Sequence, residues 1–204
     1  DEELPVWDDG LRVPHGTVGE IVVKGPQVTT AYHNAERHDR LAKIRDPDGS
    51  VRHRMGDLGY LDGSGRLWFV GRKTHRVVTP AGPLDTIPCE GVFNTHPEVK
   101  RSALVGIVIG GETVPVLVVE LERPARRWER PRIARELLEL GGRYQHTAGI
   151  RRILFHPAFP VEPERFAVEP IRLAGGSPPS QAGGHRQIEQ QREVGAAALL
   201  NPGF

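Results

Sequence analysis

The sequence is poor in cysteine and lysine, and it contains no long apolar run. A single cysteine, Cys89, stands among 204 residues, so no internal disulfide can form and a reducing, cytoplasmic location is expected. No apolar stretch approaches the roughly 20 residues that span a bilayer, and the acidic start at Asp1 is unlike a secretory signal. Only four lysines occur, and none follows Lys100.

Charge and composition are close to those of an ordinary globular protein. Hydrophobic residues make up 38% of the chain and charged residues 26%, which predicts a packed core. The formal net charge of +1 gives no reason to expect nucleic acid or an anionic membrane as a partner. The length suits one large domain or two small ones.

The first part of the chain, residues 1–71, reads as strands and loops. The β-branched run over 19–24 lies between glycines and predicts a strand. Leu11 and Val13 are also read as strand residues, and because no helix precedes them this part resembles the middle of a domain. Residues 31–44 are polar and show only weak helical periodicity.

A hairpin with a carboxylate and a guanidinium is predicted from the stretch Met55–Val77, which reads MGDLGYLDGSGRLWFVGRKTHRV. Asp57 lies between two glycines, where the backbone can adopt conformations closed to other residues. The turn Asp62–Gly65 is of the kind that joins antiparallel strands. The return strand over 67–70 ends directly before Gly-Arg, so Asp57 and Arg72 can face one ligand.

The second part of the chain predicts a small α+β unit. A short hairpin is expected around the turn at 79–83. The elements after it are a helix that opens at Pro88 and stops before Pro97, strands over 103–109 and 114–121, a helix over 131–140 and a strand over 150–155.

The last part, residues 163–204, changes in character. From Gly175 its composition is that of a flexible linker, rich in Gly, Ser and Pro. Residues 187–200 could form a helix, but only the last few of them are apolar. We therefore expect disorder over this tail.

Several of these segments resemble the ordered motifs of adenylate-forming enzymes, the superfamily of acyl-CoA synthetases, peptide-synthetase adenylation domains and luciferases. The resemblance covers residues 10–162. The segments that carry it are Gly19-Glu-Ile-Val-Val-Lys-Gly25, Met55-Gly-Asp-Leu-Gly59, Gly71-Arg72, Pro88-Cys-Glu90 and His96-Pro-Glu-Val99. Within the superfamily, the motifs Gly-Arg-Lys-x-His-Arg-Val and Thr-Ile-Pro-Cys-Glu are most similar to those of the β-lactone synthetases of bacterial olefin biosynthesis.

The resemblance implies an α+β fold in two parts. Residues 1–71 would be the β-rich end of the large N-terminal adenylation domain. Residues 72–162 would be the small α+β C-terminal subdomain, and 163–204 would be a divergent tail that resembles nothing in the superfamily.

The resemblance also implies a nucleotide site. Asp57 matches the acid that accepts hydrogen bonds from both ribose hydroxyls of ATP, a task that suits an acceptor-only carboxylate. Arg72 matches an arginine that contacts the nucleotide. Thr74 occupies the hinge position about which the C-terminal subdomain rotates. That position usually holds Asp or Lys, so the hinge assignment stays open.

Other parts that the reaction needs are absent from the sequence. ATP and Mg²⁺ are implied, but the phosphate loop, the magnesium-binding glutamate and the acyl pocket belong upstream in the superfamily. A late lysine normally follows a segment like Phe159-Pro-Val-Glu162, and here none does. We therefore assign no catalytic residue and no metal ligand and expect the chain alone to be inactive. A shifted reading frame near residue 163 is our hypothesis for this departure.

Three functions are compatible with these observations. The first is a C-terminal fragment of an ATP-dependent ligase that activates a long-chain β-hydroxy acid and closes it to a β-lactone, alongside other olefin-pathway enzymes. The second is a fragment of a long-chain acyl-CoA synthetase, with coenzyme A as the nucleophile. The third is a catalytically incompetent remnant or interaction module.

Each residue assignment also has a simpler explanation. Asp57 could cap a turn, and Arg72 could be an ordinary surface arginine. Cys89 at a helix start could have a lowered pKa, but a buried structural thiol is the more common case. The nine histidines have no metal-site spacing, and His75 is expected to be solvated.

Overall fold

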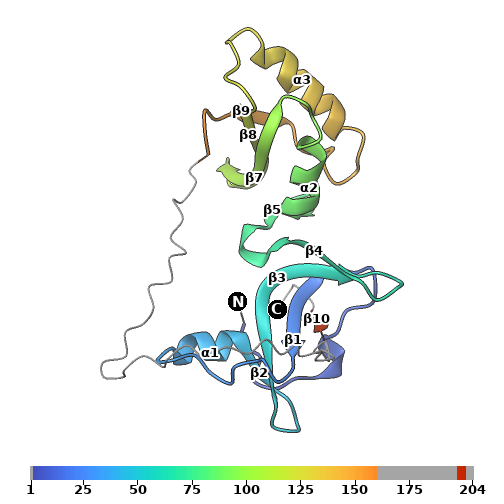
Figure 1. The fold of residues 1–204 in the computed structure, drawn as a ribbon, viewed down its shortest axis with the longest axis vertical. Coiled ribbons are helices and arrows are strands. Elements are labelled where there is room, and N and C mark those ends of the chain that lie inside the picture. The colour runs from blue at the N-terminus through green and yellow to red at the C-terminus, as the bar shows by residue number, and fades with distance from the viewer. Residues whose placement is uncertain (1, 160–196, 201–204) are drawn as a thin grey trace, which may run out of the picture.

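The computed structural model describes residues 2–159 and 197–200, and these form a mixed α+β fold (Figure 1). The helices are α1 (Glu36–Ala42), α2 (Thr86–Phe93) and α3 (Arg130–Gly141), with short 3₁₀ helices η1 (Asp9–Leu11) and η2 (Lys73–His75). The strands are β1 (Gly19–Lys24), β2 (Lys43–Arg45), β3 (Val51–Leu61), β4 (Leu67–Arg72), β5 (Val77–Thr79), β6 (Gly82–Leu84), β7 (Val99–Ile109), β8 (Glu112–Leu121), β9 (Arg152–Phe155) and β10 (Ala197–Leu200). Among the described residues, no helix has the length and apolar character that crossing a membrane requires.

The structure has two bodies, and the first contains β1 to β4, β10 and α1. It is organised around the long strand β3. Its sheet has the order β10-β1-β3-β2, and β4 also pairs with β3. The first half of β3 pairs with β2 and its second half with β4, while β1 runs antiparallel along the other edge. A small core of Trp7, Val22 and Ile44 supports this sheet.

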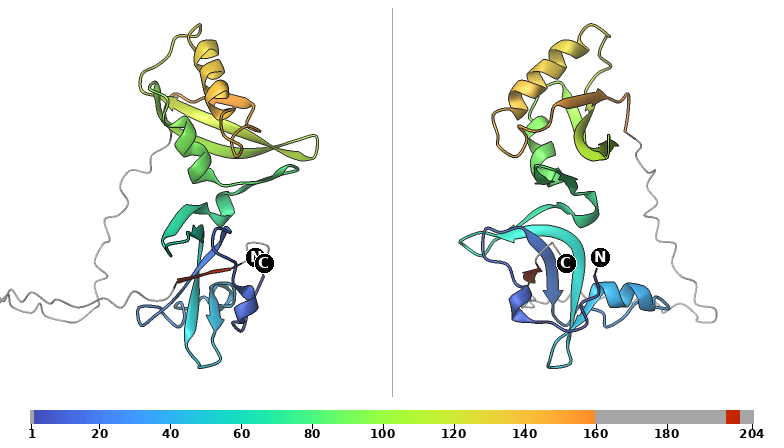
Figure 2. Two further views of the ribbon diagram at one scale, coloured as in Figure 1. Left: turned by 90° about the vertical axis from the view of Figure 1, so that its right-hand side faces the viewer. Right: turned by 180° about the vertical axis from the view of Figure 1, so that it is seen from behind.

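The second body contains β5 to β9, α2 and α3, and its core lies between a three-stranded sheet and the two helices. The sheet has the order β7-β8-β9, with β8 and β9 parallel. Phe93 of α2 and Ile133 and Leu137 of α3 are fully buried against Leu117 of β8. Figure 2 shows the two bodies joined through the segment that contains β4 and β5. The two cores support the expected division near residue 71, which stays a prediction.

Most expected elements are present, with shifted ends. The hairpin of β3 and β4, the hairpin of β5 and β6, and strands β1, β8 and β9 form where the patterns predict them. Helix α2 begins at Thr86, two residues before Pro88, because proline is tolerated throughout a first helical turn. Strand β7 begins at Val99 because its polar first residues pair with the far end of β8.

The expectation of strand residues at Leu11 and Val13 was wrong. Leu11 lies in η1 instead of a strand, because the Asp8 carboxylate accepts a hydrogen bond from the Gly10 amide and closes a tight turn. The segment 31–44 is only partly helical. Its last two residues begin β2, which pairs with β3.

The tail expectation was wrong for Ala197–Leu200, which form β10 and pair antiparallel with β1 from Glu20 to Val23. The backbone amides and carbonyls on the second edge of β1 need partners, and a strand supplies them. The rest of the expected disordered tail, 160–196 and 201–204, lies outside the described residues.

A buried carboxylate ties three segments of the second body together. Glu120 of β8 is only 3% exposed at its side chain and pairs with Lys100 at 2.7 Å and Arg101 at 2.8 Å on β7. It also accepts a hydrogen bond from the Phe159 amide at 2.6 Å, at the point where the chain leaves β9. The Lys100 ammonium and the Phe159 amide lower the pKa of Glu120 from 4.5 to about 2.

This cluster makes stability depend on pH in acid. The pKa of Glu120 is lower in the folded state, so its contribution is present above about pH 4.5 and is lost as pH falls toward about 2. Glu120→Gln should lower the denaturant midpoint at pH 7 and flatten its dependence on pH between 2 and 4.5. The exposed Glu139→Gln on α3 is the control. Equal slopes for Glu120→Gln and the unmodified chain would contradict the assignment.

Candidate functional site

Asp57 and Arg72 face each other across two paired strands. They are register partners in the ladder of β3 and β4, and the Asp57 Oδ1 accepts a hydrogen bond from Arg72 Nη1 at 2.9 Å. The same Nη1 donates to the Met55 carbonyl at 3.0 Å. The pair that the sequence predicted to share a ligand is therefore brought together by strand pairing.

This pair keeps part of its hydrogen-bonding capacity available. The Asp57 side chain is 23% exposed and the Arg72 side chain 54% exposed. Within residues 2–159 and 197–200, Asp57 Oδ2 and Arg72 Nε and Nη2 make no hydrogen bond. A carboxylate oxygen and two guanidinium donors can therefore bind a polar ligand without breaking the existing contact.

Two glycines shape the backbone on either side of the pair. Gly56 precedes Asp57 with φ of +67°, and Gly71 precedes Arg72 with φ of +134°, values that L side chains rarely adopt. At Gly71 the space is also closed, because an added Cβ would lie 2.6 Å from Thr86 Oγ1. Gly71 therefore lets the start of α2 approach β4.

The predicted hinge lies directly beyond this contact. Thr74 is exposed in the short helix η2, as is His75, which agrees with its expected solvation. After η2, Arg76 forms a two-point ion pair with Asp85, with contacts of 2.7 and 3.2 Å. That pair joins the segment after η2 to the residue that precedes α2. The role of Thr74 as a pivot stays a prediction.

A buried ion network lies on the other side of β3, and the sequence did not predict it. Arg54 of β3 contacts Glu20 of β1 at 2.7 Å, with both side chains no more than 4% exposed, and Lys73 reaches the same carboxylate at 3.2 Å. Breaking a buried pair leaves a charge without compensation. Glu20 is part of the Gly-Glu-Ile-Val-Val segment, so the motif indicated the residue without its partners.

This network forms part of the wall of a cavity beside Asp57. The cavity has a volume of about 580 Å³ and is bordered by α1, by Met55 and Gly56 of β3, and by Lys73 and Thr74 of η2. It therefore opens next to the candidate nucleotide site. Sequence patterns did not predict this cavity, because α1 and η2 are distant along the chain.

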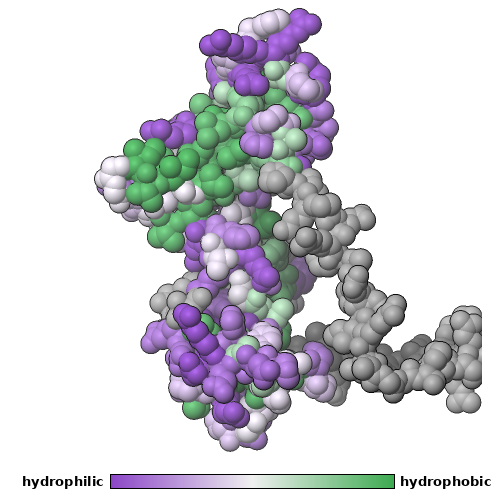
Figure 3. All heavy atoms as spheres, turned by 90° about the vertical axis from the view of Figure 1, so that its left-hand side faces the viewer, coloured by the Kyte–Doolittle hydropathy of each residue, from purple (hydrophilic) through white to green (hydrophobic). Residues whose placement is uncertain are grey.

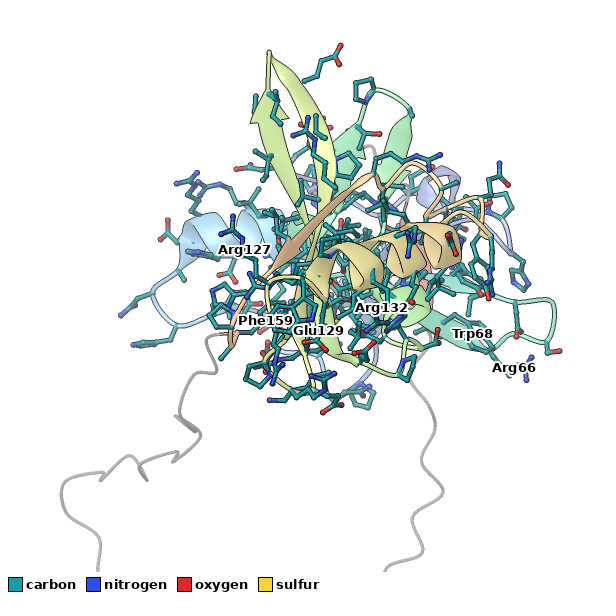
Figure 4. All side chains as sticks on the ribbon, turned by 90° about the horizontal axis from the view of Figure 1, so that it is seen from above. Arg66, Trp68, Arg127, Glu129, Arg132 and Phe159 are labelled. Atoms are coloured by element: carbon teal, nitrogen blue, oxygen red, sulfur yellow. The ribbon has the colours of Figure 1, made fainter. Side chains whose placement is uncertain are left out.

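One cluster in the second body has the residue types of a metal site. His96, Glu98 and Glu136 place ligand atoms within 4.8 Å of one another. Arg132 contacts the Glu98 carboxylate at 2.7 Å and the Glu136 carboxylate at 2.8 Å. Figure 4 shows Arg132 with Glu129 on the α3 side, away from Trp68 and Arg66 of the β3–β4 hairpin. Because a guanidinium already neutralises both acids, the cluster is an ion-pair network and does not fit a metal.

Cys89 is a structural thiol. It is 1% exposed in α2 and lies 3.6 Å from the His146 carbonyl. Burial raises its pKa to about 12, so a reactive thiolate is absent at neutral pH.

Comparison with known proteins identifies the family. No family model matches the sequence. The chain is 49% identical over 167 residues to an olefin beta-lactone synthetase of Xanthomonas campestris pv. campestris, and 46% identical over 166 residues to the corresponding protein of Stenotrophomonas maltophilia. Each match covers 79% of this chain. The chain belongs to the adenylate-forming superfamily.

The chain matches only part of each of these relatives. It spans about 30% of the length of these two curated relatives. A solved O-succinylbenzoate coenzyme A synthetase from Bacillus subtilis, in complex with ATP and magnesium ion, has a TM-score of 0.58 and 25% identity. That match covers 78% of this chain and 31% of the other.

The residues of the site fit ATP but not Mg²⁺, the other cofactor that the resemblance implies. The unpartnered oxygen of Asp57 and the donors of Arg72 suit ribose hydroxyls and phosphate oxygens. Mg²⁺ has no suitable ligand set among the described residues, since the cluster at His96 is satisfied by Arg132.

The close approach at Gly71 can be tested by adding one methyl group. Gly71→Ala should lower the free energy of unfolding by about 1–3 kcal/mol, because alanine is strained at this φ and clashes with Thr86. Gly63→Ala, where an added Cβ meets nothing within 4 Å, should change it by less than about 0.5 kcal/mol. Urea denaturation measures both. Similar losses would contradict the proposed tight contact.

Proposed function

We propose that this chain is the part of an ATP-dependent ligase that binds the ribose of the nucleotide. The whole ligase would activate a carboxylic acid as an acyl-adenylate. The observation that carries the proposal is the Asp57–Arg72 pair, with an unpartnered carboxylate oxygen and two unpartnered guanidinium nitrogens. Asp57 would accept hydrogen bonds from the ribose hydroxyls of ATP. Arg72 would hold Asp57 in place and donate to nucleotide oxygens.

The reaction that we propose for the whole enzyme is a ligation in two steps. The acid's carboxylate attacks the α-phosphorus of ATP, releasing pyrophosphate and leaving an acyl-adenylate. For a long-chain β-hydroxy acid, its own hydroxyl then attacks the activated carbonyl, closes a β-lactone and releases AMP. The two olefin beta-lactone synthetases at 49% and 46% identity favour this outcome.

A thioester product is the alternative. The Bacillus subtilis structure is named as a coenzyme A synthetase, so coenzyme A could be the second nucleophile. Supplying the full-length enzyme with a β-hydroxy acid and ATP, with and without coenzyme A, and measuring the mass of the product separates the two functions. A lactone formed without coenzyme A supports the first function, and product formation only in its presence supports the second.

Two features of the chain bear on its cellular location and on whether it can act alone. The buried, protonated thiol of Cys89 supports a cytoplasmic location, where it needs no disulfide partner. The absence of a late lysine from the sequence supports a chain that is incompetent alone. An upstream domain with a phosphate loop would be needed for activity, and other olefin-pathway enzymes would be its partners.

The role of Asp57 can be tested in a hybrid enzyme. Residues 10–159 would replace the matching segment of the Xanthomonas campestris relative, which keeps its own sequence elsewhere. Asp57→Ala removes two charge-assisted hydrogen bonds, each worth about 1.5–3 kcal/mol. The two together are worth at least about 3 kcal/mol, so kcat/KM for ATP in ATP-pyrophosphate exchange should fall by roughly a hundredfold or more, since 1.4 kcal/mol is tenfold.

Two further variants serve as comparisons. Asp57→Asn keeps one acceptor oxygen and should lose less binding. Glu139→Ala removes an exposed carboxylate from α3, outside the hairpin, and should leave the KM for ATP within twofold. The ribose role would be wrong if Asp57→Ala and Glu139→Ala had the same effect.

The 204-residue chain alone should not adenylate any acid. The sequence contains neither the phosphate loop nor the late lysine, and losing one preorganised charge-stabilising group typically costs on the order of 10²–10³ in rate. Pyrophosphate exchange with a panel of long-chain β-hydroxy acids measures this. Exchange well above a blank without protein would contradict the prediction and assign the catalytic role to one of the four lysines.

A further inference from the structure

A second cavity lies on the opposite side of η2, between the two bodies. It has a volume of about 770 Å³. Phe69 and Arg72 of β4 line one side, and Ile87 of α2 and Val105 of β7 line the other, with β5 between them. The cavity is within the size range of small-molecule sites.

The walls of this cavity gather exposed apolar side chains. Phe69 is 49% exposed, Val78 64%, Ile87 45% and Val105 38%, and all four line the same cavity. Figure 3 shows that apolar residues also gather over the adjoining hairpin of β7 and β8. Single exposed apolar residues are ordinary, but a set that surrounds one hollow marks a binding surface.

One end of the cavity is cationic. Arg72 lines it with Nε and Nη2 unpartnered among the described residues, and His75 and Arg76 lie beside it. Arg76 uses Nε and Nη2 on Asp85, whereas Arg72 binds Asp57 through Nη1 alone, so Arg72 keeps two donors that can bind an anion. The one acid in the lining is Glu90, which accepts a hydrogen bond from the Leu104 amide. Burial raises the pKa of Glu90 and disfavours its charged form.

We propose that this cavity binds the hydrocarbon chain of an amphipathic anion, with the anionic headgroup at Arg72. The proposal rests on the proposed function, because Arg72 also contacts Asp57 and would place the headgroup beside the nucleotide. The chemical class is a long-chain carboxylate or alkyl phosphate. It adds a hydrocarbon site between the two bodies to the acyl pocket that the resemblance places upstream.

The arrangement of the lining favours an alkyl chain over a protein partner. The apolar residues come from β4, β5, α2 and β7 and face a shared hollow, so a narrow flexible chain can contact all four. A chain held there would contact both bodies. Its occupancy would therefore oppose rotation about η2.

Fluorescence of cis-parinaric acid, whose emission rises in an apolar site, measures binding to the 204-residue chain without nucleotide. Dodecanoate should displace the probe at least tenfold more effectively than hexanoate. Val105→Asp should weaken binding at least tenfold, while Val108→Asp, on the same strand, 70% exposed and outside the lining, should stay within twofold. Ile87→Asp repeats the test from α2 if Val105→Asp fails to fold.

The headgroup is tested by Arg72→Gln, which should weaken dodecanoate at least fivefold and leave dodecan-1-ol within twofold. Comparing dodecanoate with dodecyl phosphate distinguishes a free acid from a phosphate-linked chain as the preferred ligand. Equal losses in Val105→Asp and Val108→Asp, or no displacement by dodecanoate, would overturn the proposal. Neither result bears on Asp57, since nucleotide exchange is measured separately in the hybrid.

Discussion

The cross-strand register of β3 and β4 is the constraint on which the site depends. It places Asp57 opposite Arg72 and brings their side chains to 2.9 Å. A slip of one residue would turn every side chain of β4 to the opposite face of the sheet. The compact turn at Asp62–Gly65 starts the pairing, and a register shift between Leu58 and Gly59 then makes Asp57 and Arg72 direct partners, so the local backbone positions the two groups that can hold a ribose.

Strand β4 also links the candidate site at Asp57 and Arg72 to the second body. Gly71 lets Thr86 come close to β4, and the Arg76–Asp85 pair joins the segment after η2 to the start of α2. The two cavities lie on either side of η2, and Thr74 lines both. A rotation at Thr74 would therefore change both cavities at once, which connects the predicted hinge to ligand binding.

The sequence predicted features that depend on neighbours along the chain. The hairpin follows from alternation and turn residues within one short segment, which brings Asp57 near Arg72. The pattern did not predict the register shift between Leu58 and Gly59 that makes these two residues direct partners. It did not predict the ion cluster at Glu120, because Phe159 reaches that acid only after the chain has passed through α3 and β9. The pairing of β10 with β1 was missed for the same reason, since a free strand edge is not visible in composition.

The central claim is that Asp57 and Arg72 bind the ribose of a nucleotide, and amide chemical shifts of the ¹⁵N-labelled chain test it most directly. Titration with AMP should perturb the amides of Gly56, Asp57 and Arg72, with the amide of Glu139 as a distant reference. The analogue 2′,3′-dideoxy-AMP lacks both hydroxyls and should perturb them at least tenfold less effectively. Equal titration curves for the two nucleotides would contradict the account.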